Sequence, residues 1–170
     1  MIETGVTQTV EDWLRIMGCT PVVENDPQTH WHVHIDYPIK SPNMLHVVVP
    51  KENQRAVVIV SALTMNSEHA TKYQGLDDEA KEEFMFDLRQ MLNSVDTDFN
   101  IEGMAGPHDM PTRIQISAIR YPDGLTLDSF ARSVGAVYKM QLNSIWMIQR
   151  RLGTDGMGPS TRFDFKRIGL

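Results

Sequence analysis

Four histidines lie close together in a stretch where polar and apolar residues alternate. Single residues separate His30, His32 and His34, and His46 follows in the next apolar run. Side chains alternate between the faces of a β-strand, so the first three are expected on one face, about 7 Å apart. A hairpin that places His46 opposite His34 would extend the row. Such a row is compatible with a zinc or other transition-metal site; no Glu or Cys completes a known ligand spacing, which favours a polar face that meets solvent or a partner.

Other residue types that carry catalysis lack the surroundings that their chemistry needs. The serines have no nucleophile-elbow glycines, and the glycines near the C-terminus lack the lysine and the strand–helix context of a phosphate loop. The only cysteine, Cys19, excludes an intrachain disulfide; it is expected to fill a place in the core and favours a reducing, cytoplasmic compartment. We therefore predict no catalytic residue, no bound metal and no cofactor.

The hydrophobic periods predict the elements that must position these residues. Their order is one helix, three strands, a second helix, two strands and a long final helix, which is typical of an α+β domain with helices on one face of an antiparallel sheet. The helices are expected over 9–17, 77–95 and 127–152, and the strands over 29–37, 44–49, 55–63, 98–104 and 112–121. A single domain is predicted for residues 1–153. The tail, 154–170, contains Phe163, Phe165 and Ile168 and either docks as an edge strand or hangs free.

Composition limits the classes of partner. The net charge of −6 argues against a dedicated nucleic-acid surface, which needs clustered Lys and Arg to displace counterions. No apolar run approaches the roughly 18 residues of a membrane span, so we expect a soluble protein with no membrane partner.

The two later helices carry more apolar residues than one buried face needs. This surplus predicts a surface for self-association, with a closed two-fold dimer as the default. It is made of Val137, Met140, Ile145, Trp146 and Ile148 on the long helix and Phe86 on the second helix. Three further methionines are candidates for an adaptable binding surface: Met85, Met104 and Met147.

The order of elements over residues 9–152 resembles the type III secretion chaperone-like fold, and the details resemble an archaeal family of uncharacterised proteins on that fold. The resemblance rests on residues 11–14 (EDWL), 36–38 (DYP), 84–92 and 113–121. Members of the wider superfamily dimerise and bind polypeptide segments along sheet and helix surfaces without catalysis. The resemblance therefore implies a binding or chaperone-like module.

Two hypotheses for the function follow. The first is a non-enzymatic homodimeric module that holds a polypeptide partner and uses a sheet face and a helix flank. The second is a metal-dependent activity, or a metal-binding protein, centred on the histidine-lined sheet face. The candidate binding residues are His30, His32, His34, His46, Phe86 and Trp146.

Overall fold

The computed structural model describes residues 4–153 and 158–159, which form a mixed α+β fold. The helices are α1 (Thr4–Ile16), α2 (Ser67–Gln74), α3 (Asp78–Leu92) and α4 (Leu127–Leu152), with a short 3-10 helix η1 (Pro122–Gly124). The strands are β1 (Val22–Val23), β2 (Thr29–Asp36), β3 (Met44–Pro50), β4 (Val57–Thr64), β5 (Asp98–Glu102), β6 (Arg113–Arg120) and β7 (Gly158–Pro159).

The strands form an antiparallel sheet with the order β1-β2-β3-β4-β6-β5, and β7 pairs with β4 beside this path. Strand β4 is central, since β3 and β6 flank it and every residue from Val57 to Leu63 is buried. The nearly continuous apolar run of this segment predicts that position, because a strand covered on both faces needs apolar side chains on both.

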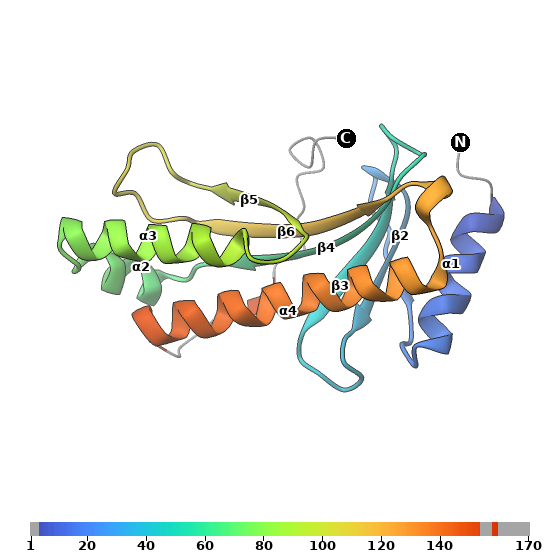
Figure 1. The fold of residues 1–170 in the computed structure, drawn as a ribbon, viewed down its shortest axis with the longest axis horizontal. Coiled ribbons are helices and arrows are strands. Elements are labelled where there is room, and N and C mark those ends of the chain that lie inside the picture. The colour runs from blue at the N-terminus through green and yellow to red at the C-terminus, as the bar shows by residue number, and fades with distance from the viewer. Residues whose placement is uncertain (1–3, 154–157, 160–170) are drawn as a thin grey trace.

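The two faces of the sheet differ in what packs on them. One face shares a single core with side chains from all four α-helices, among them Leu14, Tyr73, Phe84 and Phe130. Helix α4 runs along the molecule in front of the sheet, with α3 beside its C-terminal half and α1 near its N-terminal end (Figure 1). The other face carries a smaller apolar cluster of strand and loop residues: Val48, Ala56, Val58, Val60 and Ala62, with Ile119 packed against it. The helices that the structure describes thus lie on one face, as predicted.

Two short elements, β1 and α2, were not predicted. Helix α2 occupies a connection that looks polar in the sequence. It begins because the Asn66 side chain accepts a hydrogen bond from the backbone N–H of His69, which satisfies one of the free donors at the first turn. Its face of buried residues consists only of His69 and Tyr73, too few to give a recognisable helical period. Strand β1 is two residues long, which leaves no alternation to detect.

Helix α4 has the predicted bounds, but fewer of its apolar residues reach the surface than the sequence suggests. Thr126 and Ser129 form a reciprocal capping box at its start, and Gly153 ends it with a φ of +94°. Val137, Met140 and Ile148 are fully buried in the core, so they cannot form the predicted self-association surface. That prediction was wrong for these three residues, because the wide apolar stripe serves the sheet and α3 together.

Other predictions from the sequence were corrected or fall outside the described residues. Met85 is buried in the core, while Met104 and Met147 are partly buried against it. Gly158 and Pro159 pair with Thr64 and Leu63 of β4, beside the main path of the sheet; the docking predicted for 163–168 lies outside the described residues. Within the part of the chain that the structure describes, no helix combines the length and apolar character of a membrane span.

Candidate functional site

The histidines of β2 and β3 are brought together in part. His34 lies opposite His46 in the register of the hairpin, and His32 lies opposite Val48 on the same face. His30 does not join them. The register shifts between Thr29 and Trp31, and this irregularity leaves His30 exposed and out of the row. The strict alternation of the sequence gives no sign of the shift.

The centre of this group is a buried hydrogen bond between two imidazoles. His32 Nε2 lies 2.8 Å from His46 Nδ1, and the two residues are 4% and 2% exposed. One ring nitrogen must donate and the other must accept, so the bond forms when at least one ring is neutral. Burial, followed by the charges of His32 and His34, lowers the pKa of His46 to about 3. Burial also lowers the pKa of His32, although Asp26 and Glu24 oppose it. At neutral pH the pair is therefore uncharged.

Two carboxylates that the sequence analysis did not connect with the histidines lie beside them. Glu24 Oε1 is 2.6 Å from His34 Nδ1, and Asp26 Oδ2 is 3.6 Å from His32 Nδ1. Within residues 4–153 and 158–159, no three His, Cys, Asp or Glu side chains converge in an arrangement that could hold a metal ion. We name His32, His34, His46, Glu24 and Asp26 the histidine cluster. Its chemistry is hydrogen bonding across the β2–β3 hairpin.

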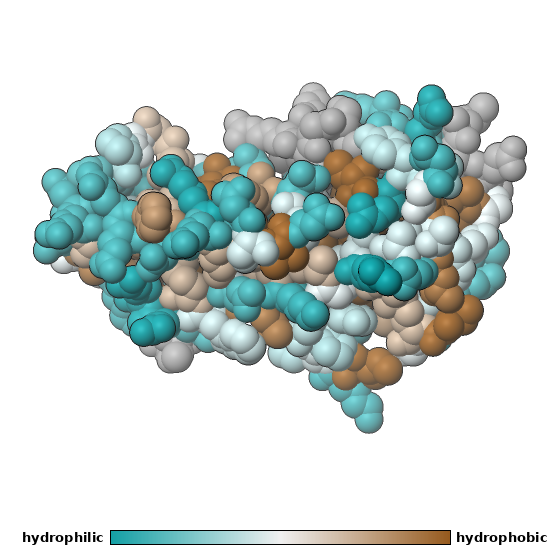
Figure 2. Space-filling view, in the orientation of Figure 1, coloured by the Kyte–Doolittle hydropathy of each residue, from teal (hydrophilic) through white to brown (hydrophobic). Residues whose placement is uncertain are grey.

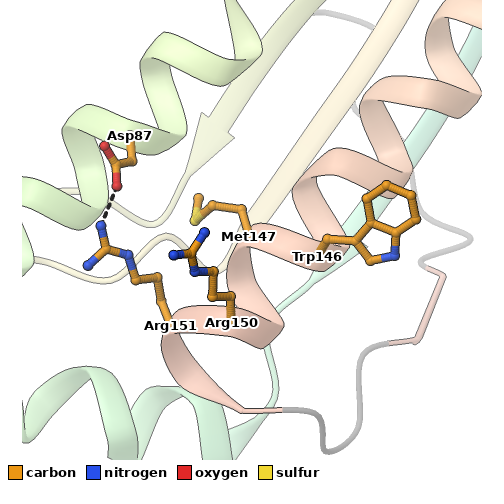
Figure 3. Close-up of a pocket in the computed structure, with 5 residues that line it drawn as sticks. All are labelled: Asp87, Trp146, Met147, Arg150 and Arg151. Atoms are coloured by element: carbon orange, nitrogen blue, oxygen red, sulfur yellow. Dashed lines mark hydrogen bonds and ion pairs between the residues drawn. The ribbon is translucent and has the colours of Figure 1, made fainter.

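A second region surrounds Trp146, on the exposed face of α4. Helical periodicity places Trp146 on the face of α4 opposite Phe130, Val137 and Ile148, and 60% of the indole residue is exposed. Next to it, a pocket of about 290 Å³ is lined by Asp87, Trp146, Met147, Arg150 and Arg151. Figure 3 shows Met147 and the two arginines on the side of α4 near Asp87, with Trp146 directed away from α3. We name these five residues the Trp146 pocket.

One wall of the Trp146 pocket is fixed by ion pairs. Arg151 donates hydrogen bonds to Asp87, shown in Figure 3, and to Glu83, whose Oε1 lies 3.3 Å from the guanidinium. These two carboxylates on α3 raise the pKa of Arg151, whose guanidinium is charged at neutral pH in any case. Arg150 points to the same pocket and makes no ion pair among the described residues. The pocket thus combines an apolar floor with one neutralised and one available cation.

Phe86, the other predicted aromatic contact, is 64% exposed on α3. It does not line the Trp146 pocket, although the next residue, Asp87, does. The surroundings of α3 are strongly hydrophilic on the face seen in Figure 2. Phe86 is therefore an isolated exposed aromatic residue and not part of a broad apolar patch.

Asp87, Arg150 and Arg151 were not predicted as site residues from the sequence. A signal for Arg150 was present, because Trp146 and Arg150 are four residues apart and so share a helix face. The ion pairs of Arg151 join residues more than 60 positions apart, and local spacing carries no information about them.

Comparisons with known proteins identify a family and a fold for the chain, and none of the matching proteins has a described activity. The family model DUF2299, described as an uncharacterised conserved protein, matches residues 6–148. One solved structure, an uncharacterised protein from Methanothermobacter thermautotrophicus, is 24% identical, with a TM-score of 0.76, and the match covers 86% of this chain and 99% of that one. This likeness shows the fold. No curated protein matches.

Proposed function

Since the chain belongs to the DUF2299 family of uncharacterised conserved proteins, we propose its function from its surface: a non-enzymatic, chaperone-like module that holds a polypeptide partner and acts as a homodimer. The binding surface is the outer face of α4 at the Trp146 pocket. The observation that carries the proposal is the exposed indole beside a pocket of about 290 Å³.

The chemistry of the Trp146 pocket suits a side chain of a polypeptide better than a small molecule. Trp and Arg are enriched in protein interfaces, where an aromatic ring supplies contact area and a guanidinium supplies directional hydrogen bonds. The pocket is open on one side and has room for one apolar side chain, whereas small-molecule sites enclose most of their ligand. Anchored by Arg151 and its two carboxylates, it is preformed, which lowers the entropic cost of binding.

The fold supports the chaperone-like part of the proposal at the level of architecture. An antiparallel sheet with helices on one face agrees with the type III secretion chaperone-like fold. The order of elements departs from the expected one by the additional short elements β1, α2, η1 and β7. Homodimerisation is carried over from the sequence as part of the proposal, with the exposed ring of Phe86 as its one candidate contact on α3; sedimentation of the wild type and of Phe86→Ala tests it.

The metal-dependent alternative has less support from the geometry. His32 and His46 direct a nitrogen of each ring at the other, and His30 lies outside the row. A metal would have to displace the hydrogen bond between the two rings. We therefore assign the histidine cluster a structural role within the proposal.

Binding to an array of short synthetic peptides tests the proposed function. We expect the wild type to bind a subset of peptides and Trp146→Ala to lose that binding, since truncation removes the main contact area. Tyr121→Ala is the matched control, because Tyr121 is another exposed aromatic residue, remote in sequence, and does not line the Trp146 pocket. Equal binding by Trp146→Ala and the wild type would contradict the proposal.

A further inference from the structure

The outer face of α4 carries two cations in line with the exposed indole. Lys139, Trp146 and Arg150 are separated by seven and four residues, which places them on one face of the helix. At 1.5 Å per residue this row extends over about 16 Å. It lies opposite the buried face of α4, so the whole row is directed away from the sheet.

The cations of this row differ from the other basic residues of α4 in having no ion-pair partner among the residues that the structure describes. Arg132 pairs with Asp128 at 2.9 Å, and Arg151 pairs with acids of α3. Lys139 and Arg150 are exposed, and neither makes an ion pair with any described residue. In a protein with a net charge of −6, two unneutralised cations on either side of an exposed indole form a local surface of opposite sign.

We propose that the partner segment which binds at Trp146 is acidic and carries one apolar anchor side chain. The anchor enters the Trp146 pocket against Met147 and the indole, and carboxylates on either side of it pair with Lys139 and Arg150. This inference rests on the proposed function, because it names the chemistry of the segment that the same site binds.

A second copy of this chain is a poorer occupant of the row than a segment of another protein. Helix α3 is the most acidic exposed element, but among the described residues four of its five carboxylates already have partners. Glu83 and Asp87 pair with Arg151. His108 lies 2.8 Å from Asp78 and 3.4 Å from Glu82, and Lys81 lies 4.0 Å from Asp78. A carboxylate that already has a partner gains little from a new cation. Glu79 is the one acid of α3 with no such pair among the described residues, and a single carboxylate cannot meet both Lys139 and Arg150, so the acids must come from elsewhere.

The probe is a fluorescent synthetic peptide with a single leucine between flanking glutamates, compared with a peptide of the same length in which glutamine replaces each glutamate. For the wild type we expect the acidic peptide to bind about tenfold more tightly, with the preference lost at high salt, as two partly exposed ion pairs predict. Lys139→Glu/Arg150→Glu should abolish the preference. Arg55→Glu/Arg89→Glu is the matched control for net charge and should retain it.

The outcomes separate this inference from the proposed function. If Trp146→Ala abolishes binding of the peptides while the charge reversal leaves their relative affinities unchanged, the acidic specificity is wrong and the binding site stands. If the acidic peptide binds equally well to Trp146→Ala, the site itself is wrong. Tighter binding of an oligouridine probe, with the same dependence on Lys139 and Arg150, would overturn the inference in favour of a nucleic acid. Equal binding of the two peptides to the wild type, or no binding of either, would also overturn it.

Discussion

The histidine cluster and the Trp146 pocket both combine aromatic rings with charged side chains, but they differ in how far these side chains are buried and in which partners they have. In the cluster, His32 and His46 are almost fully buried and hydrogen-bond to each other. At the pocket, Trp146 is 60% exposed and Arg150 has no ion-pair partner among the described residues. One region pairs its polar groups with each other in the interior, and the other exposes them on the surface. The residue types suggest a candidate site, but the burial of the side chains and their existing contacts decide whether they are free to bind a ligand.

Charge separates the two regions as clearly as burial does. The low pKa of His46, about 3, means that the buried pair stays neutral at physiological pH. Arg151 is charged at neutral pH, and Asp87 and Glu83 raise its pKa further by accepting hydrogen bonds from the guanidinium. Stability should therefore respond to acid through the histidine cluster, whereas binding should respond to salt and charge at the Trp146 pocket.

The largest effect that we expect on stability is acid destabilisation through His46. Its folded-state pKa of about 3 lies below the unfolded value of 6.5, so the unfolded state binds the extra proton first. The contribution to folding is complete above pH 6.5 and falls as the pH drops toward 3. Between pH 7 and pH 4 the loss from this group is about 3 kcal/mol. Urea unfolding at both pH values measures it.

Acidic residues also titrate in this range, so a pair of variants isolates the histidine contribution. His32→Gln/His46→Gln should lose less stability than the wild type between the two pH values. His30→Gln, which removes an exposed histidine, should lose as much as the wild type. An identical pH dependence in all three proteins would contradict the assignment.

A smaller effect is expected from breaking the hydrogen bond between the two rings at neutral pH. His46→Leu or His32→Leu leaves a buried ring nitrogen without its observed partner and should cost about 2 kcal/mol of unfolding free energy. Replacing both removes the two polar groups together, so the double variant should cost less than the sum. Chemical denaturation of the four proteins gives the coupling energy. Strictly additive costs would show that the two rings do not depend on each other.

The smallest effect concerns the wall of the Trp146 pocket. Arg151→Ala removes a partly exposed ion-pair network between α3 and α4 and should lower the unfolding free energy by about 0.5–1 kcal/mol. It should also weaken peptide binding, because the pocket loses its fixed wall. Arg132→Ala, which breaks a pair within α4 alone, serves as the control and should leave binding unchanged. Unchanged binding by Arg151→Ala would show that the wall is not required.

The fold was predictable where a long stretch of helical hydrophobic periodicity was bounded by a capping residue and a glycine. Helix α4 has Thr126 before it and Gly153 after it, and its bounds agree with the prediction. Helix α2 depends on a single Asn66 cap, and its shortness hides its period. His30 was misplaced because the register shift beside it leaves no trace in the alternation of residues.

The candidate site was predictable only in part, for a related reason. Trp146 was recognised, but it was assigned to the apolar stripe of Val137 and Ile148, whereas helical angles place it opposite them. Arg151 depends on contacts between α3 and α4, which only the folded arrangement creates. Contacts distant in the sequence therefore set the chemistry of the pocket.

Parallel measurement of unfolding and peptide binding for two variants tests the central claim most directly. Trp146→Ala should unfold within about 0.5 kcal/mol of the wild type, as an exposed residue does, yet lose peptide binding. His32→Leu/His46→Leu should be less stable but bind peptide as the wild type does under conditions where it is folded. The account would be contradicted if Trp146→Ala retained binding while the histidine variant, fully folded, lost it.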